Sequence, residues 1–101
     1  MAKIFILTKF MAKSGQEKEL LNILKEMAIY NKKTTGLISS QITCLSDNPR
    51  LFLTSSIFES TEKYEEMKRA FQNDLEMSKK YMALVELLTE KPLNEKYEII
   101  Q

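Results

Sequence analysis

The chain has 101 residues, of which 44% are apolar and 29% charged, and this balance is typical of one globular domain spanning residues 1–101. The net charge is only +1, because fifteen basic residues are interleaved with fourteen acidic ones. No basic patch for nucleic acid or an anionic membrane is therefore expected. Histidine is absent and cysteine occurs once, so the commonest acid–base group is missing and no internal disulfide or multi-cysteine metal site can form.

The opening residues contain an apolar run that is too short for a secretory signal, and no later stretch approaches the length of a membrane span. We therefore expect no membrane partner. A single free cysteine is typical of a reducing compartment, which predicts a cytoplasmic setting. With two glycines in the chain, neither a dinucleotide fingerprint nor a phosphate-binding loop can be built, and we expect neither a cofactor nor a metal.

Residues 3–11 predict a strand that is covered on both faces. Both alternating sets of side chains are largely apolar: Ile4, Ile6 and Phe10 on one side, and Phe5, Leu7 and Met11 on the other. A strand with one face in water would show polar residues at every second position. This strand must therefore meet another layer on each side.

The next segment predicts an amphipathic helix. Ser14 and Glu17 have the spacing of a capping box. The apolar residues that follow share one helical face up to Lys32 and Lys33: Leu20, Leu21, Ile23, Leu24, Met27 and Ala28. Gly36 is expected to end the exit turn.

Residues 37–58 predict a β-hairpin. Residues 37–46 and 51–58 have strand character, and the intervening DNPR supplies turn chemistry. Cys44 falls in the first of these strands, where a free cysteine is expected to behave as a small buried hydrophobe. The second strand ends at Phe58, directly before a helix cap.

The last third of the chain predicts two helical stretches and a final strand. Ser60 or Thr61 can cap a helix with Tyr64, Met67 and Phe71 on one face. Residues 73–91 continue with a stripe made of Met77, Tyr81, Leu84, Val85 and Leu88. Pro92 is expected to break this helix, and residues 94–100 to form a strand with Tyr97 and Ile99 on one side.

The order of these elements predicts an α+β fold, the ferredoxin-like βαββαβ arrangement with one antiparallel sheet and its helices on one face. The other face then needs cover, because the first strand is apolar there as well. The simplest cover is the same face of a second copy. The sequence thus predicts a homodimer in which two sheets pack together.

The chain resembles the antibiotic-biosynthesis-monooxygenase-like family of dimeric α+β barrels. Four stretches carry the resemblance: the first strand running into AKSGQEKELLNIL, the Gly36-Leu37 exit, NPRLFLTSSIFESTEKYEEM, and the distal helix with the last strand. The family includes cofactor-free oxygenases of aromatic polyketides or quinols, haem-degrading enzymes and proteins of unknown role. The resemblance therefore implies the fold more directly than a reaction.

Two departures from the family's patterns narrow the expected chemistry. The strand before the second helix commonly ends in tryptophan in the oxygenases, and Phe58 stands there in this chain. Haem-degrading members typically carry an asparagine on the first strand and a histidine ligand, and this sequence has neither. Haem binding is therefore disfavoured.

The resemblance places a pocket between the sheet and the second helical region. It implies Thr54, Ser56, Phe58, Met67 and Phe71 as substrate-binding residues, and Tyr64 and Tyr81 as catalytic phenols that hydrogen-bond a substrate oxygen and steer its deprotonation. The alternative is ordinary core packing for the aromatic and apolar residues, with each tyrosine ring buried and its hydroxyl at the surface.

Two functional hypotheses remain open. One is a small cofactor-independent monooxygenase acting on an aromatic or quinol-type molecule. The other is a non-catalytic dimeric module that binds a small ligand or serves as a scaffold. An open cavity bearing tyrosyl hydroxyls would favour the enzyme, and an interior filled by side chains would favour the module.

Overall fold

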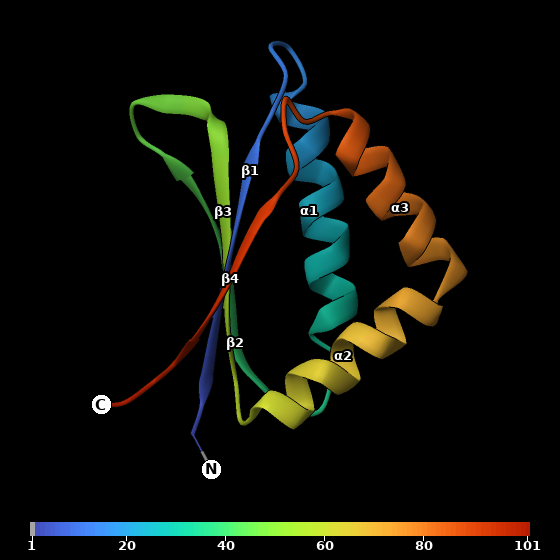
Figure 1. Cartoon of the computed structure of the whole chain (residues 1–101). Coiled ribbons are helices and arrows are strands. Elements are labelled where there is room, and N and C mark those ends of the chain that lie inside the picture. The colour runs from blue at the N-terminus through green and yellow to red at the C-terminus, as the bar shows by residue number, and fades with distance from the viewer. Residues whose placement is uncertain (1) are drawn as a thin grey trace.

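The structure, a computed structural model, describes residues 2–101. It contains four strands and three helices in the order predicted from the sequence (Figure 1). The elements are β1 (Ile4–Met11), α1 (Glu17–Asn31), β2 (Leu37–Leu45), β3 (Asn48–Phe58), α2 (Thr61–Asn73), α3 (Leu75–Glu86) and β4 (Leu93–Glu98). The two helical stretches predicted in the last third are α2 and α3.

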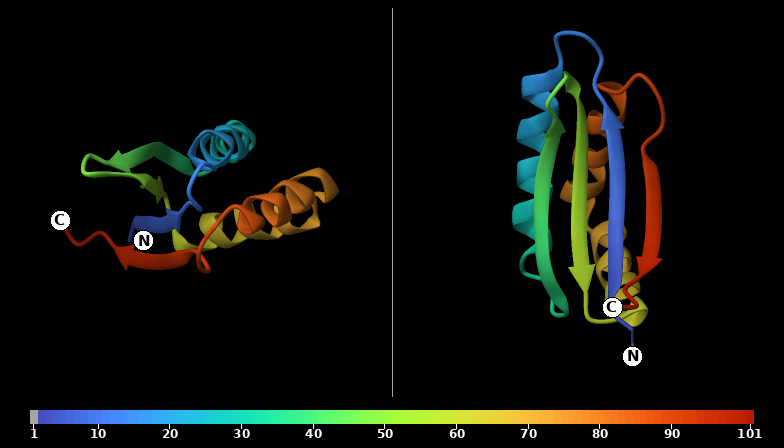
Figure 2. Two further views of the ribbon diagram at one scale, coloured as in Figure 1. Left: turned by 90° about the horizontal axis from the view of Figure 1, so that it is seen from above. Right: turned by 90° about the vertical axis from the view of Figure 1, so that its left-hand side faces the viewer.

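The strands form one antiparallel sheet in the order β2-β3-β1-β4. All three helices lie on one face of this sheet, and the other face carries no element of the described chain (Figures 1 and 2). The predicted fold class, a ferredoxin-like α+β domain, is confirmed. The sheet order is the one that right-handed crossovers produce from this sequence of elements.

Two groups of buried side chains form the core between the sheet and the helices. One lies under α1 and α3, where Phe10 and Phe52 from the central strands meet Leu20, Leu24 and Leu84. The other lies under α2 and consists of Ile4, Ile6, Phe58 and Tyr64. Phe58 and its strand partner Ile4 are almost fully buried, as expected for a cross-strand pair on the covered face.

The start of α1 differs from the predicted capping box. The helix begins at Glu17, its N-cap residue is Gln16, and no side chain caps it. Glu17 Oε1 instead accepts a hydrogen bond at 2.8 Å from the backbone N–H of Gly15, which has a φ of +84°. The assignment of Ser14 as the cap was wrong, because the chain turns between Ser14 and the helix at Gly15.

The hairpin turns earlier than predicted, at Ser46 and Asp47, and Asn48 already pairs with Leu45. The ladder between β2 and β3 is irregular between Cys44 and Leu45. Cys44 is exposed at this end of the hairpin rather than buried, so the prediction for its environment was wrong. The predicted turn residues 48–50 belong to β3.

Side-chain caps begin both later helices. Ser60 Oγ accepts from the backbone N–H of Lys63 at 3.2 Å and starts α2, as predicted. Asp74 ends α2 and also starts α3, because its Oδ1 accepts from the N–H of Met77 at 3.0 Å. α3 ends at Glu86 rather than at Pro92, and β4 ends before the predicted Ile99.

The open face of the sheet is apolar along its central strands. Phe5 and Leu7 of β1 point away from the helices, as does Ile57 of β3, because their neighbours on each strand face the core. Tyr97 of β4 lies beside Phe5, with ring centroids 6.1 Å apart. Separately, no helix in residues 2–101 has the length and apolar character of a membrane span.

Candidate functional site

A cavity of about 360 Å³ lies between the sheet and α2, and we call it the α2 cavity. Its volume falls in the range of small-molecule sites, about 300–1,000 Å³. Both the sheet and the helices contribute side chains. The lining residues are Ile6, Thr8 and Phe10 of β1, Thr54, Ser56 and Phe58 of β3, Asn94 of β4 with the preceding Pro92, Met27 and Asn31 of α1, Tyr64, Met67, Lys68, Phe71 and Gln72 of α2, and Tyr81 of α3.

The seven side chains expected at a pocket all line this one cavity: Thr54, Ser56, Phe58, Tyr64, Met67, Phe71 and Tyr81. Their depths differ. Phe58 and Tyr64 are buried, with 1% and 6% of their surface exposed, whereas Tyr81 is 39% exposed. The first two form the inner wall, and Tyr81 lies nearer to solvent.

The floor of the α2 cavity is a polar strip on the helix-facing side of the sheet. Thr8 of β1 lies directly opposite Thr54 of β3, and Ile6 lies opposite Ser56. On the other side, the Asn94 side-chain amide donates a hydrogen bond of 3.0 Å to the Thr8 hydroxyl. A ligand resting on this strip therefore meets hydroxyl groups that can donate or accept hydrogen bonds.

The wall opposite the floor comes from one face of α2. Tyr64, Met67, Lys68 and Phe71 occur at the i, i+3, i+4 and i+7 positions, which coincide on a helix. The ring of Tyr64 packs on Phe58 with centroids 5.3 Å apart and a tilt of 58°. The Lys68 ammonium lies 5.4 Å from the Tyr64 ring centroid, a cation–π distance.

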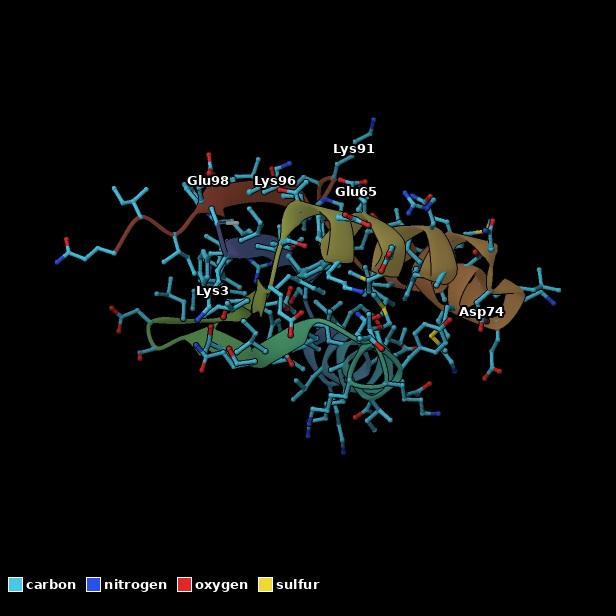
Figure 3. The ribbon with its side chains drawn as sticks, turned by 90° about the horizontal axis from the view of Figure 1, so that it is seen from below. Lys3, Glu65, Asp74, Lys91, Lys96 and Glu98 are labelled. Carbon is cyan, nitrogen blue, oxygen red and sulfur yellow. The ribbon has the colours of Figure 1, made fainter. Side chains whose placement is uncertain are left out.

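The mouth of the α2 cavity opens between α2, α3 and β4, because its exposed lining residues, Gln72, Tyr81 and Asn94, come from these elements. Glu65 of α2 and Lys96 of β4 project on the same side of the molecule (Figure 3). The interior thus combines apolar and aromatic walls with a floor that carries hydroxyl groups, and its entrance is polar.

The C-terminal end of this α2 wall is supported by contacts with α1. Tyr30 of α1 packs edge-to-face on Phe71, with ring centroids 5.9 Å apart. Desolvation raises the pKa of the Tyr30 phenol, and the nearby Asp74 carboxylate raises it further. Asp74 lies at the α2–α3 junction, remote from the sheet (Figure 3). Tyr30 thus acts as a neutral aromatic support for Phe71.

A second cavity of about 350 Å³, the α1 cavity, lies between α1 and strands β2 and β3. Leu24 and Ala28 of α1 form one side, and Ser40 and Ile42 of β2 form the other. The sequence analysis did not anticipate it. Its existence depends on the distance between α1 and β2, which no pattern within either element specifies.

Several lining residues of the α2 cavity were not predicted. Thr8 follows from the strand alternation, since it lies between Ile6 and Phe10 on the same face. Asn31 lies one helical turn after Met27, on the apolar stripe of α1. A polar residue on that stripe could have indicated that a cavity lies beside it. Lys68 and Asn94 are ordinary surface residue types, and only the packing brings them to the cavity.

The arrangement is suited to binding a flat apolar ring. Phe58, Met67 and Phe71 supply apolar contact, while Tyr64 and Lys68 can hydrogen-bond or charge-stabilise an oxygen substituent. Within residues 2–101, no three acidic or cysteine side chains come together as a metal site would require. The chemistry of the site, as far as the described residues carry it, rests on hydroxyls, phenols and one ammonium group.

The fold is that of the antibiotic biosynthesis monooxygenase class of proteins, and the resemblance predicted from the sequence is confirmed at the level of fold. A proposed antibiotic biosynthesis monooxygenase from Nitrosomonas europaea superposes with a TM-score of 0.85 at 8% identity, over 98% of this chain and 91% of that one. SnoaB, a cofactor-independent oxygenase from Streptomyces nogalater, superposes with a TM-score of 0.82 at 10% identity, covering 100% and 96%.

A protein from Shewanella oneidensis superposes with a TM-score of 0.82 at 18% identity, over 97% of this chain and 91% of its own. No protein-family model matches the chain, and no curated protein matches it in sequence. At these identities the structural likeness establishes the fold alone, and the chemistry has to be argued from the cavity.

Proposed function

We propose that the protein is a small cofactor-independent monooxygenase that acts on an aromatic or quinol-type molecule in the α2 cavity. The observation that carries the proposal is the convergence of Tyr64, Lys68 and Tyr81 on one cavity of ligand size that combines apolar and aromatic side chains with the hydroxyl groups of its floor. Its fold likeness to SnoaB, a cofactor-independent oxygenase, supports it.

The proposed reaction begins with an electron-rich phenol whose O–H proton passes to water at the cavity mouth. The Lys68 ammonium and the Tyr64 phenol stabilise the resulting phenolate, in a cavity where charge interactions are stronger than in water. Negative charge then reaches the ring carbon opposite the oxygen, which still carries a hydrogen. That carbon is the site of attack on oxygen.

Electron transfer to O₂ and formation of a carbon–oxygen bond give a peroxide anion on this carbon, which takes back a proton from water to become a hydroperoxide. Loss of the carbon-bound proton and cleavage of the O–O bond then yield a carbonyl group and water. The substrate supplies all four electrons, so that one oxygen atom enters the product and the other leaves as water. The roles of the protein are to orient the ring, exclude water and favour the anion.

The test is oxygen consumption by the purified protein with 1-naphthol or anthrone, the latter reacting through its phenolic tautomer. We expect one O₂ consumed per quinone or ketone formed, with one labelled oxygen atom in the product when ¹⁸O₂ is supplied. Lys68→Gln and Tyr64→Phe should each lower the rate about tenfold or more, since each removes a group that stabilises the anion. Lys79→Gln, which changes an exposed lysine outside the cavity, is the control.

Oxygen consumption no faster than in buffer, with all members of a phenol and quinol panel, would refute the enzymatic proposal. The non-catalytic binding module would then be the better description. One observation favours that second candidate: Phe58 stands where the related oxygenases place a tryptophan, and its hydrocarbon ring offers no N–H donor.

We also propose that the protein works as a homodimer, with the open face of the sheet covered by a second copy. Supporting this, the central strands present Phe5, Leu7, Leu53 and Ile57 on that face, and a single copy leaves them without a packing layer. Sedimentation equilibrium at micromolar concentration should give the mass of a dimer, and Leu53→Glu should give a monomer. A monomeric wild-type protein would contradict the proposal.

A further inference from the structure

The helix side of the α1 cavity carries two lysines. Lys25, Ala28, Ile29 and Lys32 all line this cavity and occur at the i, i+3, i+4 and i+7 positions, which coincide on one helical face. Lys32 is the C-cap residue of α1, so the two lysines are about 10.5 Å apart along the helix axis. Ala28 and Ile29 lie between them. This wall of the cavity thus has an apolar centre with an ammonium group at each end.

Neither of these lysines is neutralised by a carboxylate. Within residues 2–101, Lys25 and Lys32 take part in no ion pair. Glu26, which follows Lys25 in the chain, pairs instead with Lys80 of α3. The positions three and four residues before and after each lysine, where a helical ion-pair partner would lie, hold no Asp or Glu. Since no acidic residue of the described chain lines the α1 cavity either, its positive charge is uncompensated.

The apolar side chains of the α1 cavity differ in kind from those of the α2 cavity. They are Leu24, Met27, Ala28, Ile29 and Ile42, with Phe10 as the one aromatic ring among the described residues. The α2 cavity, in contrast, is lined by five phenylalanine and tyrosine side chains. Contact with aliphatic walls removes an alkyl chain from water without requiring a flat molecule. The α1 cavity is therefore the one suited to an alkyl chain.

The sheet side and the mouth of the α1 cavity suit a charged end group. Ser40 of β2 lies directly opposite Ser56 of β3, and both residues line the cavity with hydroxyls that can donate to a carboxylate. Lys25, Ile29 and Lys32 are exposed, so the mouth lies between α1 and β2, the edge strand beside it (Figure 2). A ligand can therefore keep its charged end near water while its chain is buried.

We propose that the α1 cavity is a second ligand site, which binds a medium-chain alkyl carboxylate with its chain against Leu24 and Ile42 and its carboxylate beside Lys25 and Lys32. The inference goes beyond the proposed function, because it concerns another cavity and another class of ligand. Charge complementarity selects an anion, and the aliphatic walls select its chain. The cavity volume of about 350 Å³ lies within the range of small-molecule sites.

The experiment compares octanoate with octanamide, a neutral molecule of nearly the same shape. Dissociation constants are measured by titrating each probe, below its micelle concentration, into ¹⁵N-labelled protein and following the backbone amide signals by NMR. The test variant is Lys25→Gln with Lys32→Gln. The matched control is Lys18→Gln with Lys33→Gln, which removes the same charge from two exposed lysines that line neither cavity.

We expect the wild type to prefer octanoate over octanamide about five- to tenfold, because two exposed ammonium groups each contribute modestly. The test variant should lose this preference and the control should keep it. The amide signals that shift should be those of residues 25–32 and 40–42. A wild type without the preference, or one that binds neither probe at millimolar concentration, would overturn the proposal. So would shifts confined to residues 64–72 together with weaker binding in Lys68→Gln, since they would place the probe in the α2 cavity.

A second comparison tests whether the chain is buried. Hexanoate carries the same charge as octanoate but is two methylene groups shorter, so it should bind about tenfold more weakly. Equal affinities would show that the lysines attract any small anion at the surface and would refute a cavity site. Neither measurement involves oxygen consumption, so the monooxygenase proposal and this one can fail separately.

Discussion

Replacing Gly36 by alanine should destabilise the protein more than the same change at Gly15. Both glycines have a positive φ, +96° and +84° respectively, which side chains with a Cβ rarely adopt. This conformation costs alanine about 1–2 kcal/mol at either position. The two variants therefore share the same backbone cost and differ in which atoms the new methyl group contacts.

The added Cβ at Gly15 would meet no atom within 4 Å, whereas at Gly36 it would lie 2.6 Å from both Cβ and Cγ of Lys63 and 2.9 Å from Cδ. The Lys63 Cβ is attached to the backbone of α2, so rotating the lysine side chain cannot relieve that contact. Forcing a methyl group into such a space costs about 1–3 kcal/mol. We expect a total loss of about 2–5 kcal/mol for Gly36→Ala and about 1–2 kcal/mol for Gly15→Ala.

Urea unfolding followed by circular dichroism measures both losses, with the slope m checked for constancy between variants. The double variant Gly36→Ala with Lys63→Ala removes Cγ and Cδ and should recover part of the stability. Equal midpoints for the Gly15 and Gly36 variants would refute the steric argument. They would mean that α2 can move away from the β2 entry turn at little cost, although the Glu59 N–H donates to the Gly36 carbonyl at 2.9 Å.

Two further predictions concern α3 and the wall of the α2 cavity. The Glu26 carboxylate accepts a hydrogen bond from the Lys80 ammonium and thereby raises the pKa of Lys80. The interaction therefore contributes all of its stabilisation below the pKa of lysine in the unfolded chain, about 10.5. Glu26→Gln should therefore lower the free energy of unfolding at pH 8, and the difference from wild type should shrink as pH rises through the folded pKa; a difference that grows above pH 10.5 would contradict this. Phe58→Ala should cost about 3–5 kcal/mol in chemical denaturation, because the ring is 1% exposed and packs on Tyr64. A loss below about 1 kcal/mol would show that Phe58 only lines the cavity and is not part of the core.

The amino-acid sequence by itself determined the order of the elements and hence the fold class. The apolar alternation of β1, the Ser60 cap and the Gly36 turn are local features, and each depends on residues that are close in the chain. Where a local rule failed, a competing local contact decided the outcome. Glu17 accepted a hydrogen bond from Gly15 instead of completing a capping box with Ser14, and the hairpin turned at Ser46 and Asp47, next to an irregularity in the ladder between Cys44 and Leu45.

The sequence also pointed to one face of α2, because Tyr64, Met67 and Phe71 coincide at helical spacing whatever the tertiary structure is. Which strand residues lie opposite that face followed from the register between β1 and β3, where Thr8 meets Thr54. Tertiary structure alone decided that Lys68 and Asn94 reach the same cavity and that a second cavity adjoins it at Asn31. Cavities are spaces left between packed elements, and their existence depends on distances of several ångströms between segments remote in sequence, which no periodicity within one segment encodes.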